Sequence, residues 1–166
     1  MSEVQVERRT FETHSPAETE ALGASFASTL KTPALILLSG ELGAGKTAFV
    51  RGMAQGLNVP PEQRVTSPTY ILLHVYKGGR ATLYHIDAYR LGGGADEFEA
   101  SGLNECFDDQ NGVVCIEWPE KAGGMNWSDE RFLIEIEHVD PTVRTLVFNA
   151  FGSRNQEVCR QLESHG

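Results

Sequence analysis

An apolar run that leads straight into a glycine-rich loop constrains the fold of this chain more than any other feature. The run is Ala34–Leu38, and the loop, residues 40–47, reads GELGAGKT. This loop fits the pattern G-x-x-x-x-G-K-[S/T], which binds phosphate groups between a buried strand and a helix. A continuous apolar run is typical of a strand that is buried on both faces, and apolar side chains recur at helical spacing over residues 47–57. The sequence therefore predicts a phosphate-binding loop inside an α/β domain.

Strand-like runs on either side of turn-forming residues predict that the sheet is mixed. Each such pair is typical of an antiparallel hairpin. The sequence contains two of them, 70–76 with 81–87 and 133–136 with 143–148. A fully apolar run at 113–116 predicts a further buried strand. We expect a single P-loop NTPase-like α/β domain over residues 1–152, whose mixed sheet has a parallel core plus antiparallel hairpins and is flanked by helices, followed by a polar tail over residues 153–166.

The segment Ser15-Pro16-Ala17-Glu18 marks the start of a helix, after a strand-like run at 4–10. Ser15 can cap the helix, Pro16 suits the first helical position, and Glu18 completes a capping box. Pro33 marks the end of the helical segment.

Composition excludes several classes of function. The chain of 166 residues carries 14 basic and 23 acidic side chains, for a formal charge of −9, which argues against unaided binding to nucleic acid or to an anionic membrane. Its three cysteines lack CxxC spacing, so neither a disulfide framework nor a zinc site is expected, and a reducing cytoplasm fits better. The polar start of the chain argues against a signal peptide, and the longest apolar run is too short to span a membrane. We expect a cytoplasmic protein.

Each residue of the loop has a physical role in holding phosphate. Glycine lets the backbone adopt conformations that other residues resist, so that the loop N–H groups form a concavity for anions at the positive end of the next helix. Lys46 adds a full charge for the outer phosphates, and Thr47 offers a hydroxyl to magnesium. We expect the whole loop to contact the nucleotide: Gly40, Glu41, Leu42, Gly43, Ala44, Gly45, Lys46 and Thr47.

Two acidic residues close strand-like runs and are candidates for a magnesium site. Asp87 follows the run at 82–86, and Glu117 follows the run at 113–116. Ligands of open α/β sheets bind beyond the carboxyl ends of the strands, and magnesium takes carboxylate oxygens. Glu117 could instead orient a water as a base, and either acid could be an ordinary strand end. Trp118 could form a wall of the nucleotide pocket or lie in the core.

The first hairpin brings a hydroxyl-rich loop toward Asp87. With Gly78-Gly79 at its tip, Tyr76 pairs with Ala81, and Tyr70 lies opposite Asp87. Ser67 and Thr69 immediately precede Tyr70, so they can form a switch-like segment that senses a terminal phosphate. The alternative is a plain turn that enters the strand.

Four motifs in one order give the chain a specific resemblance. They are GELGAGKTAFVRG (40–52), VTSPTY (65–70), YHIDAYRL (84–91) and CIEWPEKAG (115–123). Together they resemble the bacterial TsaE (YjeE) family of small P-loop ATPases, over about residues 15–148.

The resemblance implies a function that spacing alone does not. It implies ATP and Mg2+ as cofactors, slow hydrolysis, and action on a complex of the TsaB and TsaD proteins during threonylcarbamoyl modification of the adenosine next to the anticodon. It implies contact with tRNA only indirectly, through that complex, and none with a membrane. Lys46, Asp87 and Glu117 become the catalytic residues, Thr47, Glu117 and Asp87 the metal ligands, with Glu117 the better candidate. Ser15 and Arg144 are expected to touch the base or ribose.

Two other functions fit the loop. One is a small-molecule P-loop kinase, although the sequence lacks a helical lid insertion that carries arginines. The other is a nucleotide-binding switch module without real turnover, because residues that bind a nucleotide overlap with those that hydrolyse it.

Overall fold

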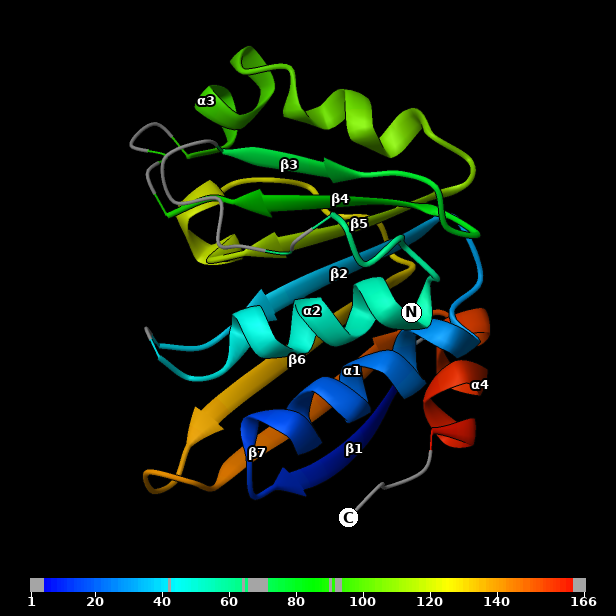
Figure 1. Ribbon diagram of the computed structural model, residues 1–166. Helices are drawn as coiled ribbons and strands as arrows, with labels where there is room; N and C mark the ends of the chain where they lie inside the picture. Colours follow the sequence, from blue (N-terminus) through cyan, green and yellow to red (C-terminus); the bar gives the residue numbers. More distant parts are fainter. Residues whose placement is uncertain are drawn as a thin grey trace.

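A mixed β-sheet organises the protein, and helices lie on both of its faces (Figure 1). The computed structural model describes residues 5–41, 43–63, 65, 72–89, 91 and 94–162. In that part of the chain, seven strands form one sheet in the order β1-β7-β6-β2-β5-β4-β3. The strands are β1 (Val6–Thr13), β2 (Ala34–Ser39), β3 (Leu73–Tyr76), β4 (Thr82–Asp87), β5 (Gly112–Glu117), β6 (Arg131–His138) and β7 (Arg144–Phe151). The helices are α1 (Pro16–Thr29), α2 (Lys46–Gly56), α3 (Gly94–Ala100) and α4 (Ser153–Gln161), with the 3-10 helices η1 (Leu103–Asp108) and η2 (Pro119–Ala122).

Strand β2 lies at the centre of the sheet because its side chains are apolar on both faces. It pairs in parallel with β5 on one side and with β6 on the other, and β5 pairs in parallel with β4. The pairs β3–β4 and β6–β7 are antiparallel hairpins, and β1 adds to β7 in the antiparallel sense. This topology confirms the predicted mixed sheet with a parallel core and antiparallel hairpins.

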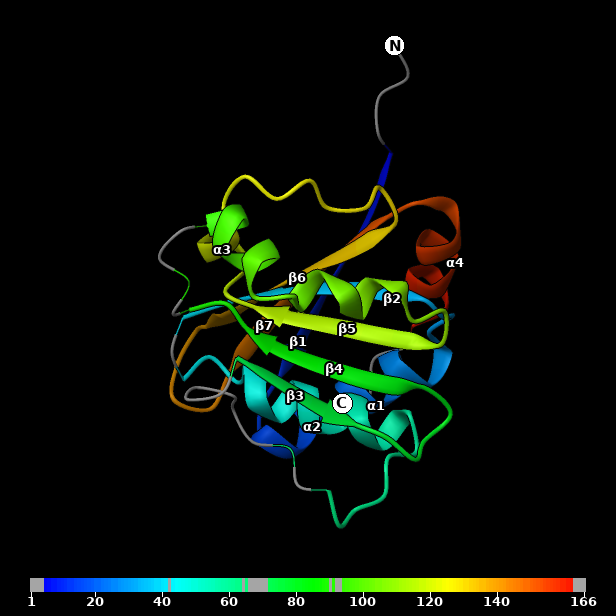
Figure 2. The same ribbon diagram turned by 90° about the horizontal axis from the view of Figure 1, so that it is seen from above.

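Two apolar layers hold the helices to the sheet. Helices α1 and α2 cover one face, whereas α3 and η1 cover the other (Figure 2). Under α1 and α2, four phenylalanine rings pack with centroids 4.8–5.9 Å apart, mostly edge to face: Phe26, Phe49, Phe132 and Phe148. The second layer is formed by smaller aliphatic side chains around Phe98.

Glycines let the backbones of α1 and α2 approach each other directly. A Cβ atom at Gly52 would lie 1.9 Å from the carbonyl oxygen of Glu20, and one at Gly23 would lie 2.3 Å from that of Phe49. Small residues of this kind bring two helices into backbone contact along their crossing. The position of α2, and of the loop that precedes it, is therefore fixed by α1.

Helix α1 begins where the sequence predicts, with one difference in its cap. The Ser15 hydroxyl accepts a hydrogen bond from the backbone N–H of Glu18 at 3.1 Å, as an N-cap does. The Glu18 carboxylate accepts from the backbone N–H of His14 rather than from that of Ser15. The reciprocal bond of the capping box therefore reaches one residue further back than predicted.

The first hairpin forms, but its predicted register is wrong by two residues. Tyr76 pairs with Leu83 rather than with Ala81. The backbone N–H of Asp87 bonds to the carbonyl oxygen of Leu72 at 2.9 Å, and Tyr70 lies outside the described residues. A shift of two residues keeps every side chain on its predicted face of the sheet, because side chains alternate with a period of two.

Contacts of Arg80 explain the longer turn. Its backbone N–H bonds to the carbonyl oxygen of Leu57 at 2.9 Å, and its guanidinium donates to the carbonyl oxygens of Ala27 and Leu30, the latter at 3.2 Å. These bonds hold the turn against the ends of α1 and α2, so Arg80 cannot pair within the hairpin.

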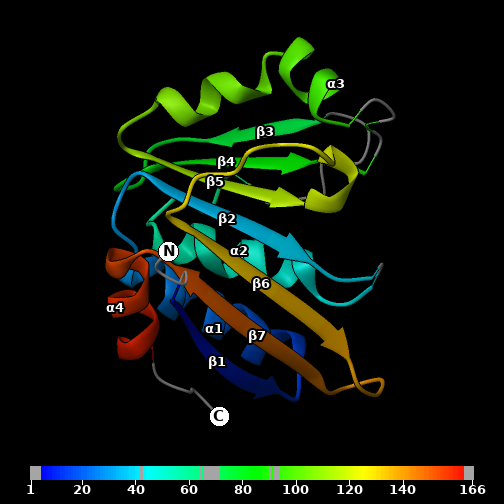
Figure 3. The same ribbon diagram turned by 180° about the vertical axis from the view of Figure 1, so that it is seen from behind.

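The last helix packs on the far edge of the sheet. Helix α4 contacts β1 and β7 (Figure 3), and Val158, Cys159 and Leu162 are buried in the same apolar layer as α1 and α2. Arg9 of β1 donates to the carbonyl oxygen of Cys159 at 3.2 Å. Across the ranges described above, none of the helices is both long and apolar enough to cross a membrane.

We predict a pH-dependent contribution from the hydrogen bond between Tyr84 and Asp109. The Tyr84 hydroxyl donates to Asp109 Oδ2 at 2.7 Å. This bond holds the pKa of Asp109 below its usual range and raises the pKa of Tyr84 to about 12. A carboxyl group with a depressed pKa stabilises the fold fully only when the pH is above the usual pKa of that group. Tyr84→Phe should therefore lower the free energy of unfolding by about 1 kcal/mol at neutral pH. The loss should shrink as the pH falls through the depressed pKa of Asp109.

Urea unfolding of the wild type and of Tyr84→Phe at pH ~7 and pH ~3 measures this contribution. A loss of stability that stays the same at both pH values would contradict the prediction.

Candidate functional site

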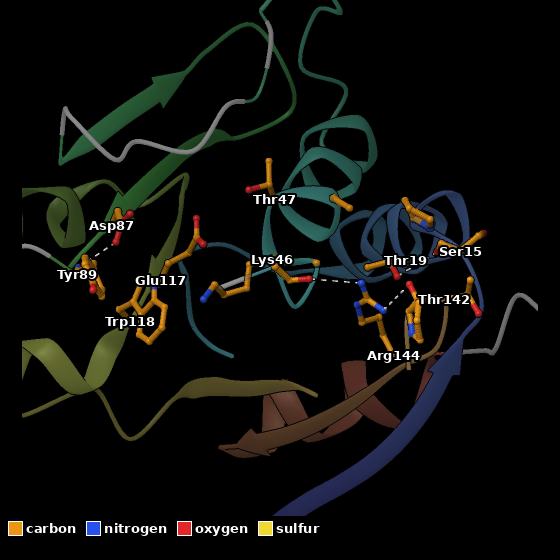
Figure 4. Close-up of a pocket in the computed structure, with 15 residues that line it drawn as sticks. Ser15, Thr19, Lys46, Thr47, Asp87, Tyr89, Glu117, Trp118, Thr142 and Arg144 are labelled. Atoms are coloured by element: carbon orange, nitrogen blue, oxygen red, sulfur yellow. Dashed lines mark hydrogen bonds between the residues drawn. The ribbon is translucent and has the colours of Figure 1, made fainter. Parts of the chain in front are cut away.

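A cavity of about 650 Å3 opens beyond the carboxyl ends of β2, β4 and β5. Figure 4 shows Asp87, Glu117 and Trp118 on one side of it and Ser15, Thr19 and Arg144 on the other, with Lys46 and Thr47 between them. The lining residues are Ser15, Pro16, Thr19, Gly43, Gly45, Lys46, Thr47, Ala48, Asp87, Tyr89, Glu117, Trp118, Pro141, Thr142 and Arg144. The position matches the general rule that open α/β sheets bind ligands at this edge.

The glycine-rich loop turns from β2 into α2 at the base of the cavity. Gly43 and Gly45 have φ angles of 80° and 107°, which L side chains rarely adopt. Helix α2 begins at Lys46, so its positive end faces the cavity. Gly43, Gly45, Lys46 and Thr47 line the cavity, whereas Gly40, Glu41 and Ala44 are not among its lining residues. Leu42 lies outside the described residues.

Lys46 is a buried cation held among polar and aromatic groups. Its ammonium donates to the carbonyl oxygen of Gly40 and lies 3.8 Å from the centre of the Trp118 ring. Burial lowers the pKa of Lys46, and the charges of Glu117 and Asp87 oppose that shift. The side chain is therefore a poorly solvated positive charge at the place where a phosphate group would enter.

Asp87 and Glu117 lie next to each other at the ends of parallel strands. The register pairs Asp87 of β4 with Glu117 of β5, and the two residues are only 6% and 3% exposed. Burial raises the pKa of Asp87, whose Oδ1 accepts a hydrogen bond from the backbone N–H of Tyr89 at 2.9 Å. Two buried carboxylates close to each other favour a bound cation.

The donor set fits magnesium held partly by a nucleotide. No three His, Cys, Asp or Glu side chains gather into a metal-holding group within the described residues. Magnesium is usually held by one or two carboxylates and by substrate phosphates. The hydroxyl of Thr47 and the carboxylates of Asp87 and Glu117 all line the cavity, so they could supply the ligands that the protein contributes.

Glu117 is bonded to a histidine that the sequence did not single out. His85 of β4 is fully buried, and its Nε2 forms a hydrogen bond with Glu117 Oε2. The five histidines of the sequence lack the spacing of metal sites, so the sequence alone predicts no function for any of them. The one available sign was the spacing of two residues between His85 and Asp87, which places both side chains on the same face of β4.

Aromatic side chains form one wall of the cavity. Trp118 is half-buried and lines the cavity rather than lying wholly in the core. Its ring centroid lies 5.1 Å from that of Tyr89, which is 53% exposed. The backbone of Trp118 has a φ angle of 57°, so the chain turns sharply after β5, and the ring lies against the ammonium of Lys46.

The opposite wall comes from the start of α1 and from the turn between β6 and β7. Arg144 donates to the carbonyl oxygen of Ala44 at 2.9 Å and to that of Asp140 at 3.0 Å, which ties this turn to the glycine-rich loop. Thr19 lies one helical turn after Ser15, and its Oγ1 is 2.7 Å from Thr13 Oγ1.

Ser15 and Arg144, which the resemblance implied as contacts of the base or ribose, line the cavity. The sequence did not indicate six further residues as part of this lining: Pro16, Thr19, Ala48, Tyr89, Pro141 and Thr142. The spacing of four residues from Ser15 could have indicated Thr19. The predicted switch residues Ser67 and Thr69 lie outside the described residues.

Comparison with known proteins supplies an independent line of information. Residues 13–146 match the sequence model of a family described as "Threonylcarbamoyl adenosine biosynthesis protein TsaE". A Bacillus subtilis protein named tRNA threonylcarbamoyladenosine biosynthesis protein TsaE is 37% identical over 153 residues, which is 92% of each chain. A Streptomyces coelicolor protein of the same name is 45% identical over 101 residues, covering 60% of this chain and 66% of its own. The crystal structure of Bacillus subtilis YdiB superposes with a TM-score of 0.78 at 31% identity, covering 96% of this chain and 97% of that one.

Proposed function

This chain belongs to the TsaE family of threonylcarbamoyl adenosine biosynthesis proteins, and from that membership we propose that it is an ATPase which serves the threonylcarbamoyl modification of tRNA. It binds ATP with magnesium in the cavity beyond β2, β4 and β5, and it hydrolyses ATP slowly. The observation that carries the proposal is the cavity itself, because it joins the loop residues Lys46 and Thr47 to the paired carboxylates Asp87 and Glu117.

In the proposed mechanism, the loop and α2 bind the phosphates. The positive end of α2 faces the cavity, and backbone N–H groups at a helix start hold phosphate oxygens. The Lys46 ammonium exchanges its carbonyl acceptor for oxygens of the outer phosphates. Because this cation is poorly solvated, its attraction to phosphate is stronger than in water. The ring of Trp118 then lies beside the bound nucleotide, and Ser15 and Arg144 face its base or ribose.

The acidic pair handles the metal and the attacking water. A magnesium ion held here would supply positive charge that neutralises the charge of the phosphates. Thr47, Asp87 and Glu117 would hold the ion through oxygen atoms, with Glu117 the better candidate of the two acids, unless Glu117 instead orients the attacking water as a base. Glu117 is bonded to His85 through Oε2, and the residue lines the cavity.

We further propose that TsaB and TsaD are the protein partners and that tRNA is met only through their complex. The net charge of −9 supports this division, because an acidic surface repels the phosphate backbone of a free tRNA. Co-purification with TsaB and TsaD in the presence and absence of ATP tests it, and failure to co-purify under both conditions would overturn it.

Replacing Glu117 with glutamine tests the assigned chemistry. The variant keeps the size of the side chain but loses the charge, so it should still bind ATP while phosphate release falls by at least about 100-fold. Phosphate release with TsaB and TsaD present, beside isothermal titration of ATP, measures the two properties separately. Glu135→Gln, at an acid of β6 outside the cavity lining, is the matched control and should hydrolyse ATP as the wild type does.

The same assays separate the proposal from its alternatives. Unchanged phosphate release by Glu117→Gln would overturn the role of this residue. Tight ATP binding by the wild type without phosphate release, even with both partners, would favour a switch module. ATP-dependent phosphorylation of a metabolite would favour a small-molecule kinase.

A further inference from the structure

We propose that His85 is a positioning residue that holds Glu117 in its working orientation. This inference rests on the proposed function and assigns a residue that acts through another one. The imidazole donates its Nε2–H to Glu117 Oε2, which fixes the carboxylate of a residue that lines the cavity.

The position of His85 in the fold supports this role. In the β4–β5 pair, His85 lies opposite Cys115 and Asp87 lies opposite Glu117. His85 therefore lies two residues before Asp87 on β4, with its side chain on the same face of the sheet as the acidic pair, and it is fully buried. The bond from His85 to Glu117 runs across the two strands, beneath the cavity that Glu117 lines, while His85 itself is not among the lining residues.

The other ring nitrogen indicates where the proton lies. His85 Nδ1 is buried and has no hydrogen-bond partner among the described residues. A buried N–H without an acceptor is costly, and Nε2 faces a carboxylate oxygen that can only accept while it is ionised. The arrangement with one proton, on Nε2, satisfies the bond to Glu117 and leaves Nδ1 as a bare acceptor.

A fixed carboxylate matters because Glu117 must present one particular oxygen. An unsupported glutamate side chain samples several rotamers, and each rotamer moves its oxygens relative to the phosphate loop. Partners behind a reacting or metal-binding group typically contribute 10- to 100-fold to affinity or activity. Through its bond to Oε2, His85 selects one orientation of Glu117 without touching the substrate.

Two variants at position 85 and one control at position 74 test the proposal through the turnover number. His85→Phe keeps a planar ring but removes the donor, so kcat should fall about 10- to 100-fold while the KM for ATP stays within about twofold. His85→Gln places an amide N–H near the position of Nε2 and should restore kcat to within about threefold of the wild type. His74→Phe, a half-buried residue paired with His85 on β3, is the matched control and should leave kcat unchanged.

A double-mutant cycle shows whether His85 acts through Glu117. In a Glu117→Gln background, adding His85→Phe should lower kcat by less than about twofold further, because the group that His85 orients is already lost. An equal loss in both backgrounds would overturn the proposal, as would a His85→Phe enzyme with the kcat of the wild type. A wild type that releases no more phosphate than Lys46→Ala would instead overturn the proposed function.

Histidine nitrogen NMR of the wild type tests the geometry without any variant. Two-bond 1H–15N correlations should show a proton on His85 Nε2. A ring protonated at Nδ1 alone would overturn the proposal, whether or not the variants fold.

Discussion

Replacing Lys46 with alanine is expected to reduce phosphate release from ATP by about 1,000-fold, because it removes the one full positive charge inside the phosphate loop. Lys46 is the first residue of α2 and lines the cavity together with Asp87 and Glu117. The other cation of the lining, Arg144, is bonded to the carbonyl oxygens of Ala44 and Asp140, so it is not free to replace Lys46. ATP binding should weaken as well, since the same charge is used in the ground state. Phosphate-release assays with TsaB and TsaD present and isothermal titration of ATP measure both effects.

The loss of activity should occur without loss of fold. Burial lowers the pKa of Lys46, which means that the charged side chain is less stable in the folded protein than in the unfolded chain. Alanine at this position should therefore leave the melting temperature of the ligand-free protein unchanged or slightly raised. Lys77→Ala, at an exposed position beside β3, is the matched control. A Lys46→Ala protein that hydrolyses ATP like the Lys77→Ala control would contradict the assignment of the loop.

Replacing Gly52 with alanine is expected to destabilise the protein by at least about 3 kcal/mol. Alanine normally stabilises the interior of a helix relative to glycine. Here the added Cβ would lie 1.9 Å from the carbonyl oxygen of Glu20, and a backbone atom of a packed helix cannot move aside alone. Helices α1 and α2 would have to separate, which would loosen the contact between Phe26 and Phe49.

Urea unfolding followed by circular dichroism measures the effect of Gly52→Ala. Arg51→Ala, an exposed residue of the same helical turn, should change the free energy of unfolding by no more than about 0.5 kcal/mol. Equal stability of Gly52→Ala and the wild type would mean that α1 and α2 do not approach as closely as described.

Features that depend on neighbouring residues could be predicted from the sequence. The run at 34–38 predicts β2 because five consecutive apolar residues need both faces covered, and Ser15 predicts the start of α1 because its hydroxyl has a backbone N–H within reach. The pattern GELGAGKT predicts the loop between β2 and α2 because it too consists of adjacent residues. In each of these segments, a few adjacent side chains determine the conformation.

Features that depend on contacts between distant segments could not be predicted from the sequence. The register of the first hairpin is set by Arg80, whose partners are at the ends of α1 and α2. The bond between His85 and Glu117 requires β4 and β5 to be parallel neighbours. The sequence of either strand alone does not indicate that the two strands pair. Likewise, Thr142 reaches the cavity only because β6 and β7 bring their turn to the start of α1.

The contact between Arg144 and Ala44 has a consequence for the stage of synthesis on the ribosome at which the cavity can form. These residues are 100 positions apart, and β2 receives its parallel partners β5 and β6 only from later parts of the chain. A nascent chain that has just exposed the glycine-rich loop therefore has the α1 residues of one wall but lacks the β6–β7 turn of that wall and the whole of the other wall. Since translation proceeds from the N-terminus, the cavity, and with it the proposed capacity to hold a nucleotide, forms only after the last strands of the sheet have been made.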